Sequence, residues 1–206
     1  MHRALGLRGA CPLRGARIVR FLSTYYPSPS GQLDNMAKGV TVTSSIITIS
    51  GSTAEAAPGV MVQEEIPLSL DLLSREVLLI YAVDVNVNAP DAQATVNSSV
   101  GCSLSTTSRT TLGNINNTNV FARGTKQIRA GGFVDGGVAF TEHAPETPTS
   151  NALDFIAICP TNDLFVQIQG TNNLAAKSAN WRIWCARAKV TADIFAALVT
   201  SEQLSA

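Results

Sequence analysis

The stretch that decides the fold is Glu76-Val-Leu-Leu-Ile-Tyr-Ala-Val-Asp-Val-Asn-Val87. Its β-branched and aromatic residues predict a β-strand, and Pro90 ends the strand. One face is apolar along its whole length and consists of Val77, Leu79, Tyr81, Val83, Val85 and Val87. The other face is apolar at Leu78 and Ile80 and becomes polar from Asp84 onward. We therefore expect a strand that is buried on both faces at its start and on one face at its end, as in a β-sandwich.

Strand signals recur on both sides of this stretch. The segments with β-branched or alternating composition are Val40–Ile49, Ala94–Leu104, Asn119–Ile128, Asp154–Cys159, Asp163–Gln169 and Asn180–Val190. Turns rich in Asn, Gly, Pro and Thr separate them. Apolar residues alternate in the fifth of these segments, so we expect Val166 and Ile168 in the core, together with Tyr81 and Val83. Seven or eight such strands predict an all-β fold, an antiparallel sandwich or barrel.

Only the end of the chain has a helical pattern. Thr191 is a suitable N-cap for a helix that runs to Leu204, with apolar residues such as Ile194 at helical spacing. In the preceding strand, Trp181 and Trp184 lie on opposite faces. We expect one of these tryptophans in the core and the other covered by a partner or by the helix.

The composition separates two parts of the chain. Its 206 residues are 45% hydrophobic and only 15% charged, whereas globular domains carry about 25% charged residues. No apolar run approaches the roughly 18 residues that a membrane-spanning helix needs, so we expect no membrane span. Residues 1–35 carry five arginines and one acidic residue, a net +4, and residues 36–206 carry the compensating −4. We therefore divide the chain into a basic N-terminal arm or targeting segment, residues 1–38, and a β-sandwich domain, residues 39–206.

The basic arm has three open interpretations. Its arginines are Arg3, Arg8, Arg14, Arg17 and Arg20. The composition is typical of a mitochondrial presequence, and Arg20-Phe-Leu-Ser23 is similar to a processing site of one. Alternatively, the five arginines make weak, salt-sensitive contacts to packaged nucleic acid. In the third interpretation Met36 is the true start. A native chain that retains residues 1–22 favours an arm that works in the mature protein, a start at Ser23 favours import, and a start near Met36 removes the arm from the protein.

Few residues carry catalytic or metal-binding chemistry. His143 is the only histidine of residues 39–206 and lies in a Pro-rich loop, which favours a solvated residue over a catalytic base. Asp84, Asp154 and Asp163 lie at strand edges and turns, where aspartate is common for local backbone reasons. They therefore do not predict a calcium site.

The four cysteines are far apart and lack the paired spacing of zinc ligands: Cys11, Cys102, Cys159 and Cys185. Free cysteine packs like a small hydrophobic residue, so we expect isolated buried thiols rather than a disulfide framework. We expect no catalytic activity, no cofactor and no metal.

The C-terminal part of the chain resembles a known family. Three stretches are similar to the end of the jelly-roll capsid proteins of small tailless viruses and phages: Leu164-Phe-Val-Gln-Ile-Gln-Gly-Thr-Asn-Asn173, Asn180-Trp-Arg-Ile183 and Ala196-Ala-Leu-Val-Thr-Ser-Glu202. The segment Arg75–Val87 is similar to the first long strand of that fold. The similarity is one of pattern and covers residues 60–206.

The resemblance implies an eight-stranded antiparallel jelly roll over residues 39–206, with a short C-terminal helix and an N-terminal arm. It implies a structural protein of the virion that assembles with copies of itself into a closed icosahedral shell around the genome. Two alternatives remain open. One is a mitochondrially imported β-sandwich that serves as an accessory subunit of a larger assembly. The other is a carbohydrate-binding or other ligand-binding sandwich.

The arm differs from the commonest basic arms of this family. It has no lysine before Lys38, and Leu, Ile and Val lie between its arginines, with Phe21 directly after the last of them. Two roles for a retained arm therefore remain open. Its arginines contact nucleic acid, or its apolar residues pack the arm between subunits, which the apolar interleaving favours.

Overall fold

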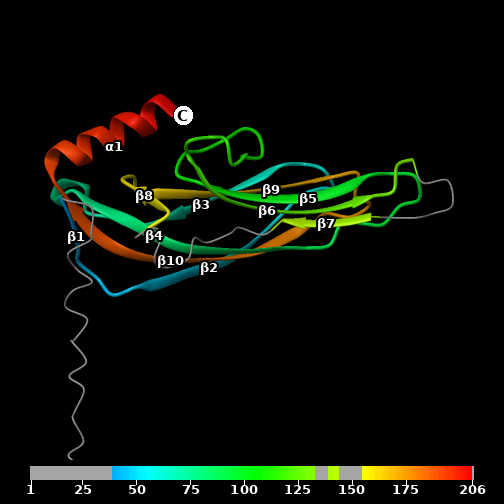
Figure 1. Cartoon of the computed structure of the whole chain (residues 1–206), viewed down its shortest axis with the longest axis horizontal. Helices are drawn as coiled ribbons and strands as arrows, with labels where there is room; N and C mark the ends of the chain where they lie inside the picture. The colour runs from blue at the N-terminus through cyan, green and yellow to red at the C-terminus, as the bar shows by residue number, and fades with distance from the viewer. Residues whose placement is uncertain (1–38, 133–138, 144–154, 206) are drawn as a thin grey trace, which may run out of the picture. The chain divides into compact units, whose positions relative to one another are not determined.

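The computed structural model of the chain describes residues 39–132, 139–143 and 155–205. The chain divides into two units, Met1–Asp34 and Asn35–Ala206, and every described residue belongs to the second. This unit consists mainly of antiparallel strands in two sheets, followed by a short C-terminal helix (Figure 1). The all-β antiparallel sandwich predicted from the sequence is therefore confirmed.

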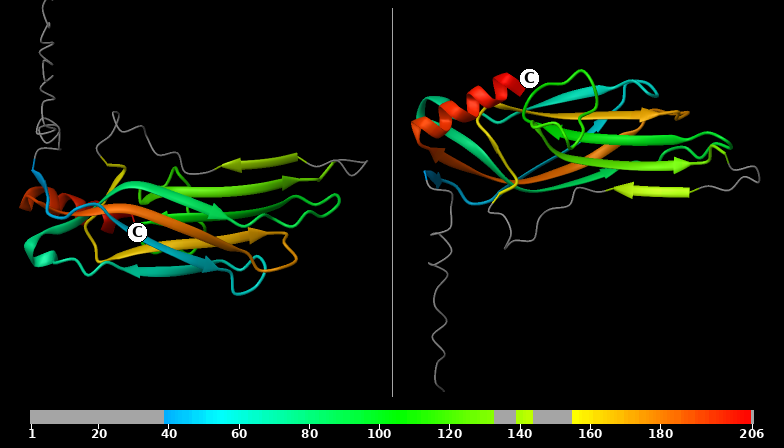
Figure 2. Two further views of the ribbon diagram at one scale, coloured as in Figure 1. Left: turned by 90° about the horizontal axis from the view of Figure 1, so that it is seen from below. Right: turned by 45° about the horizontal axis from the view of Figure 1, so that its top comes forward.

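Each sheet has five strands among the described residues. The two sheets lie one above the other in Figure 1, and the left view of Figure 2 looks onto the face of the sandwich. Sheet A has the order β1-β10-β4-β8, and β2 also pairs with β10. Its strands are β1 (Val40–Val42), β2 (Ile47–Ala54), β4 (Glu76–Val87), β8 (Ala157–Cys159) and β10 (Ser178–Val190). Sheet B has the order β3-β9-β5-β6-β7. Its strands are β3 (Val62–Pro67), β5 (Ser98–Ser105), β6 (Val120–Arg129), β7 (Ala139–His143) and β9 (Asp163–Thr171). A 3₁₀ helix, η2 (Leu72–Ser74), precedes β4, and α1 (Ala192–Ser205) follows β10.

The described residues form ten strands where eight were expected. One reason is that Val40–Ile49 forms two strands. The N–H groups of Thr43 and Ser44 both donate to the Arg187 carbonyl, at 2.8 and 3.3 Å, and the Arg187 N–H donates to Ser44 Oγ at 2.9 Å. These bonds lie between the end of β1 and the start of β2, where the regular ladder with β10 is interrupted. The other reason is that β3 and β7, short edge strands without clear apolar alternation, gave no strand signal.

The core between the sheets is formed by alternate residues of the central strands. Val166 and Ile168 of β9 have an exposed fraction of 0%, and Val83 of β4 has 4%, so these three predictions are confirmed. Trp181 also lies in this core, and its indole N–H donates to Thr53 Oγ1 at 3.1 Å. Trp184 is half-buried on the opposite face of β10, as the alternation predicts.

Strand β4 contains a bulge that the sequence pattern did not predict. Trp184 of β10 pairs with Ala82, but the next residue, Cys185, pairs with Ile80. Tyr81 and Ala82 therefore lie opposite a single residue of β10. A bulge of this kind shifts the alternation of side chains by one position.

The bulge divides the expected apolar face of β4 between two clusters. Before it, Leu78 and Ile80 face the core between the sheets, whereas Val77 and Leu79 belong to a second cluster on the outer side of sheet A. After it, the valines of β4 face the core between the sheets. The prediction of one continuous apolar face is therefore wrong. Tyr81, which was expected in the core, is half-buried and packs against the second cluster.

The second cluster covers the outer face of sheet A at the end where β10 leads into α1. Its buried members are Val40, Val77, Leu79, Ala188 and Val190. Ile194 and Phe195 of α1 pack against them, so α1 is held by apolar contacts at its first turn. The later part of β4 has no such cover, and Asp84 on its outer face is exposed. This confirms that β4 is buried on both faces at its start and on one face at its end.

Gly51 provides a test of the core. It lies opposite Trp181 in the β2–β10 pair, and a Cβ at this position would overlap the indole ring. We expect Gly51→Ala to lower the free energy of unfolding by about 1–3 kcal/mol because the core would be overpacked. The matched control is Ser52→Ala on the exposed face of β2, which should change it by less than about 0.5 kcal/mol. Urea unfolding midpoints measure both, and an unchanged midpoint for Gly51→Ala would contradict the placement of Trp181.

Candidate functional site

The arginines expected to contact nucleic acid lie outside the described residues. They are Arg3, Arg8, Arg14, Arg17 and Arg20, and Cys11 lies in the same segment. Every candidate site with a geometry therefore belongs to the sandwich domain.

The structure does not bring His143 and the aspartates together. His143 is exposed at the end of β7, and Asp163 begins β9, both in sheet B. Asp84 is exposed on β4 in sheet A, and Asp154 lies outside the described residues. Within the described ranges, no group of three or more His, Cys, Asp or Glu side chains could hold a metal ion.

Cys102, Cys159 and Cys185 are free thiols in the core between the sheets. Burial raises the pKa of Cys102 to about 12 and the pKa values of Cys159 and Cys185 to about 11. The thiolate is the reactive form of cysteine, so these residues are poor nucleophiles at neutral pH. The prediction of isolated buried thiols is confirmed for these three cysteines.

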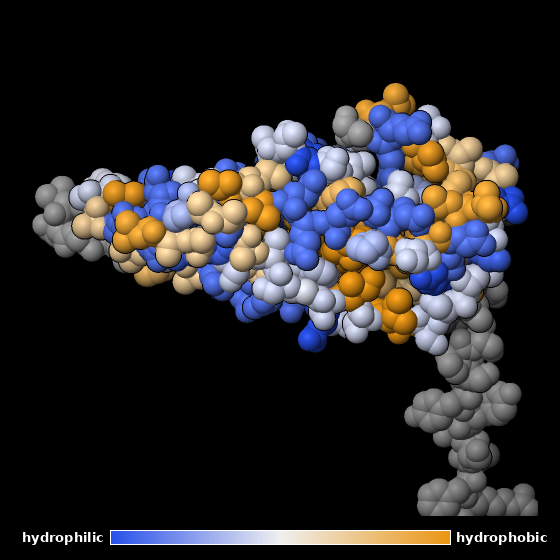
Figure 3. Space-filling model, turned by 180° about the vertical axis from the view of Figure 1, so that it is seen from behind, coloured by the Kyte–Doolittle hydropathy of each residue, from blue (hydrophilic) through white to orange (hydrophobic). Residues whose placement is uncertain are grey.

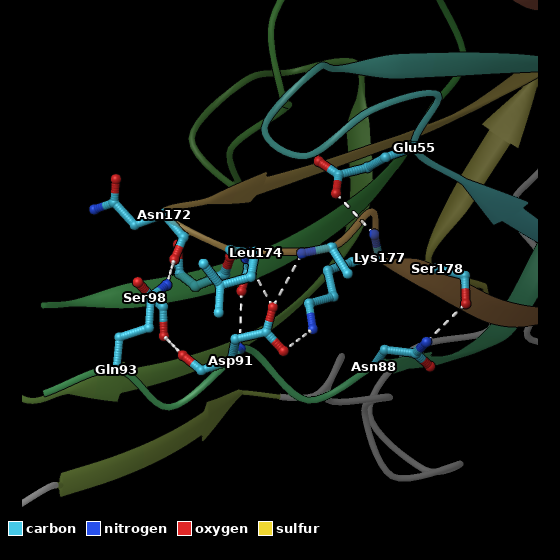
Figure 4. Close-up of polar contacts among 12 residues, drawn as sticks. Glu55, Asn88, Asp91, Gln93, Ser98, Asn172, Leu174, Lys177 and Ser178 are labelled. Atoms are coloured by element: carbon cyan, nitrogen blue, oxygen red, sulfur yellow. Dashed lines mark hydrogen bonds and ion pairs between the residues drawn. The ribbon is translucent and has the colours of Figure 1, made fainter.

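A polar cluster links strand ends of both sheets (Figure 4). The Lys177 ammonium donates to Asp91 Oδ1 at 2.6 Å, and Asp91 Oδ2 accepts from the N–H of Leu174 at 2.8 Å. Glu55 accepts from the N–H of Gly170 at 2.6 Å and from the N–H of Lys177 at 2.9 Å. These contacts join the residues that follow β2 and β4 to β9 and to the residue that precedes β10.

This cluster is a structural brace. Glu55 and Lys177 have exposed fractions of only 6% and 8%, and their charged groups bond to other members of the cluster. Carboxylates that accept hydrogen bonds from backbone N–H groups stabilise the loops to which those N–H groups belong. Sequence reasoning missed the brace because its members are far apart in the chain. The one available signal was the presence of charged residues beside turns in a charge-poor domain.

The brace predicts a dependence of stability on pH. The ion pair with Lys177 and the N–H of Leu174 lower the pKa of Asp91 below its ordinary value of 3.8. A carboxyl group with a lowered folded-state pKa stabilises the fold above its unfolded pKa, and this contribution is lost as the pH falls through the folded pKa. We expect Asp91→Asn to lower the urea midpoint at about pH 7. The difference from wild type should shrink as the pH falls below the ordinary aspartate pKa of 3.8 and through the lower folded-state pKa. Asp84→Asn, on the exposed face of β4, is the control. A midpoint difference for Asp91→Asn that persists unchanged at the acid end would contradict this prediction.

The outer face of sheet B is covered by a polar layer. Gln167 of β9 has an exposed fraction of 0%, although it lies on the face opposite the core. Its Oε1 accepts from Ser103 Oγ and its Nε2 donates to Ser105 Oγ, both at 2.8 Å. The loop of residues 106–119 lies over this pair, and its Gly113 N–H donates to Ser103 Oγ at 2.9 Å. This buried polar side chain is therefore fully engaged with neighbouring residues.

The outer face of sheet A is polar and open at the end away from α1. A shallow hollow of about 390 Å³ lies there, lined by Ser50, Asp84, Asn86, Asn180 and Arg182 among others. The guanidinium carbon of Arg182 lies 5.8 Å from the centroid of the Trp184 ring, a cation–π distance. The hollow offers small polar groups to a ligand or to another protein surface.

The edges of the sandwich carry exposed backbone and apolar side chains. Within the described residues, β7 pairs only with β6, and all five of its residues are exposed. The exposed fractions of Ile46, Leu73 and Phe140 are 61%, 99% and 70%. On the face in Figure 3, apolar residues form separate groups among polar ones. Open strand edges and exposed apolar groups are typical of surfaces that pair with another chain.

Among the described residues, α1 included, no helix is long and apolar enough to cross a membrane. Comparison with known proteins gives no match to any family model and no match to any curated protein.

Proposed function

We propose that the chain is the structural subunit of a capsid, a non-enzymatic protein of the virion that assembles with copies of itself into a closed shell around the genome. The observation that carries this proposal is the nested order in which the strands pair. The resemblance of residues 60–206 to jelly-roll capsid proteins adds the functional class.

The nested order becomes clear when two strands are set aside. These are β1, which precedes β2 along the same edge of β10, and β7, which extends sheet B beyond β6. In the remaining set the first strand pairs with the last, β2 with β10, and the pairs β3–β9, β4–β8 and β5–β6 follow inward. The pair β10–β4 joins β2–β10 to β4–β8 in sheet A, and the pair β9–β5 joins β3–β9 to β5–β6 in sheet B. This order supports a jelly roll over residues 39–206, the architecture of many capsid domains.

The surface of the domain supports self-assembly. The edge of β7 that has no partner strand among the described residues, and the exposed side chains of Ile46, Leu73 and Phe140, provide surfaces that another subunit can cover. Identical subunits form closed assemblies when each contact repeats under a rotation that closes. The polar cluster that most resembles a site instead supports the fold, since Glu55, Asp91 and Lys177 bond to loop backbone and to each other.

Native mass measurement tests the proposal. We expect the full-length protein at micromolar concentration to form particles many times heavier than the 21.7 kDa chain. Phe140→Asp on the open edge should shift the population toward smaller species, because it places a charge on an apolar contact surface. Thr171→Asp, an exposed position on β9, introduces the same charge elsewhere and should not. A full-length protein that stays monomeric would overturn the proposal.

A further inference from the structure

A pocket of about 170 Å³ lies between α1 and the sandwich. Its walls are partly apolar, formed by Phe121 of β6, Ile158 of β8, Pro160 and Leu198 of α1. Its polar lining includes Thr106 and, from the last turn of α1, Glu202.

Glu202 is an incompletely paired carboxylate in this pocket. The hydroxyl groups of Thr106 and Thr161 hydrogen-bond to it. Its Oε2 atom is buried and has no hydrogen-bond partner among the residues that the structure describes. Burial raises the pKa of Glu202. A buried carboxylate oxygen without a donor is costly, and it becomes favourable when a cation or donor pairs with it.

We propose that this pocket binds a guanidinium group, with the Glu202 carboxylate as its anionic partner. A guanidinium presents several N–H donors in one plane, which suits a carboxylate, and its flat faces pack well on apolar walls such as Phe121 and Pro160. It is also more weakly hydrated than an ammonium, so it enters a partly apolar pocket at lower cost. With the methylene that carries it, a guanidinium has about five heavy atoms, a small group for a pocket of about 170 Å³.

The guanidinium group has two sources. One is a free guanidinium compound. The other is an arginine of residues 1–38, which hold five arginines and a net charge of +4 over residues 1–35, against −4 for the rest of the chain. Both sources present the same group to Glu202, so the experiment has to separate them.

The first titration uses the full-length chain in which all five arginines of the N-terminal arm are changed to Gln: Arg3, Arg8, Arg14, Arg17 and Arg20. This variant lacks the internal source of guanidinium groups. N-acetyl-arginine amide is titrated, and the rise in melting temperature gives the dissociation constant. N-acetyl-citrulline amide has nearly the same shape without the charge, and N-acetyl-lysine amide carries an ammonium. We expect the arginine derivative to bind at least about 10-fold more tightly than either, and Glu202→Gln to remove this preference.

The second titration repeats the measurement on the wild-type chain. If N-acetyl-arginine amide raises the melting temperature of wild type at least several-fold less than that of the glutamine variant, the pocket is occupied by an arginine of the N-terminal arm. An equal shift assigns it to a free guanidinium compound. The proposal would be overturned if the arginine and citrulline derivatives raised the melting temperature equally. It would also be overturned if the rise caused by the arginine derivative were unchanged in Glu202→Gln. The citrulline comparison needs no substitution at Glu202, so it decides the matter even if that variant folds poorly. None of these readouts depends on whether the protein forms a shell.

Discussion

Val166→Asp should leave no soluble folded protein. Val166 has an exposed fraction of 0% and lies on β9, which pairs with β3 on one side and β5 on the other. A carboxylate at this position would have no cationic partner in the core and would cost several kcal/mol. A domain of this size has a free energy of unfolding of about 5–15 kcal/mol, so a large part of the total would be lost. Soluble yield and the melting temperature from circular dichroism measure the effect.

The same strand offers a second test position and a matched control. Ile168→Asp should fail in the same way, since Ile168 is equally buried and faces the same core. Thr171→Asp adds the same charge at the exposed end of β9 and should fold with a normal yield. Normal yield and melting temperature for either core variant would show that the inward face of β9 has been reversed.

Removal of residues 1–35 should abolish the assembled particle while the sandwich domain stays folded. Apolar residues lie between or directly after the arginines and favour an arm that packs between subunits: Leu5, Leu7, Ile18, Val19 and Phe21. Native mass measurement of the truncated chain, with circular dichroism as the check on folding, gives the result. The affinity for single-stranded nucleic acid should change little in this case.

The opposite result has a distinct signature. If the five arginines neutralise phosphates, the slope of log affinity against log salt should be no steeper than about −3.5 for a single strand. The truncated chain would then still assemble and would lose this salt-sensitive affinity, which would refute the packing role of the arm. The matched control is the full-length chain with all five arginines changed to Gln. It keeps the apolar residues, so it should still assemble if the arm acts by packing.

Sequence alone predicted the elements whose signals are local. The bounds of β4, Glu76–Val87, follow from its β-branched composition and from the proline that ends it. The inward side of β9 follows from the alternation of Val166 and Ile168 with polar residues. The helix at the end of the chain follows from its N-cap and its helical spacing.

Only the tertiary structure decided the features that depend on residues far apart in the chain. The bulge at Tyr81 exists because β10 pairs differently before and after Trp184, and nothing in the sequence of β4 marks that change. The break between β1 and β2 depends on the backbone of Arg187. The brace around Lys177 and the pocket at Glu202 each combine segments from distant parts of the chain. Local propensity reports on a residue and its near neighbours, whereas these features depend on which strand, loop or helix lies opposite, and that is set by packing of the whole domain.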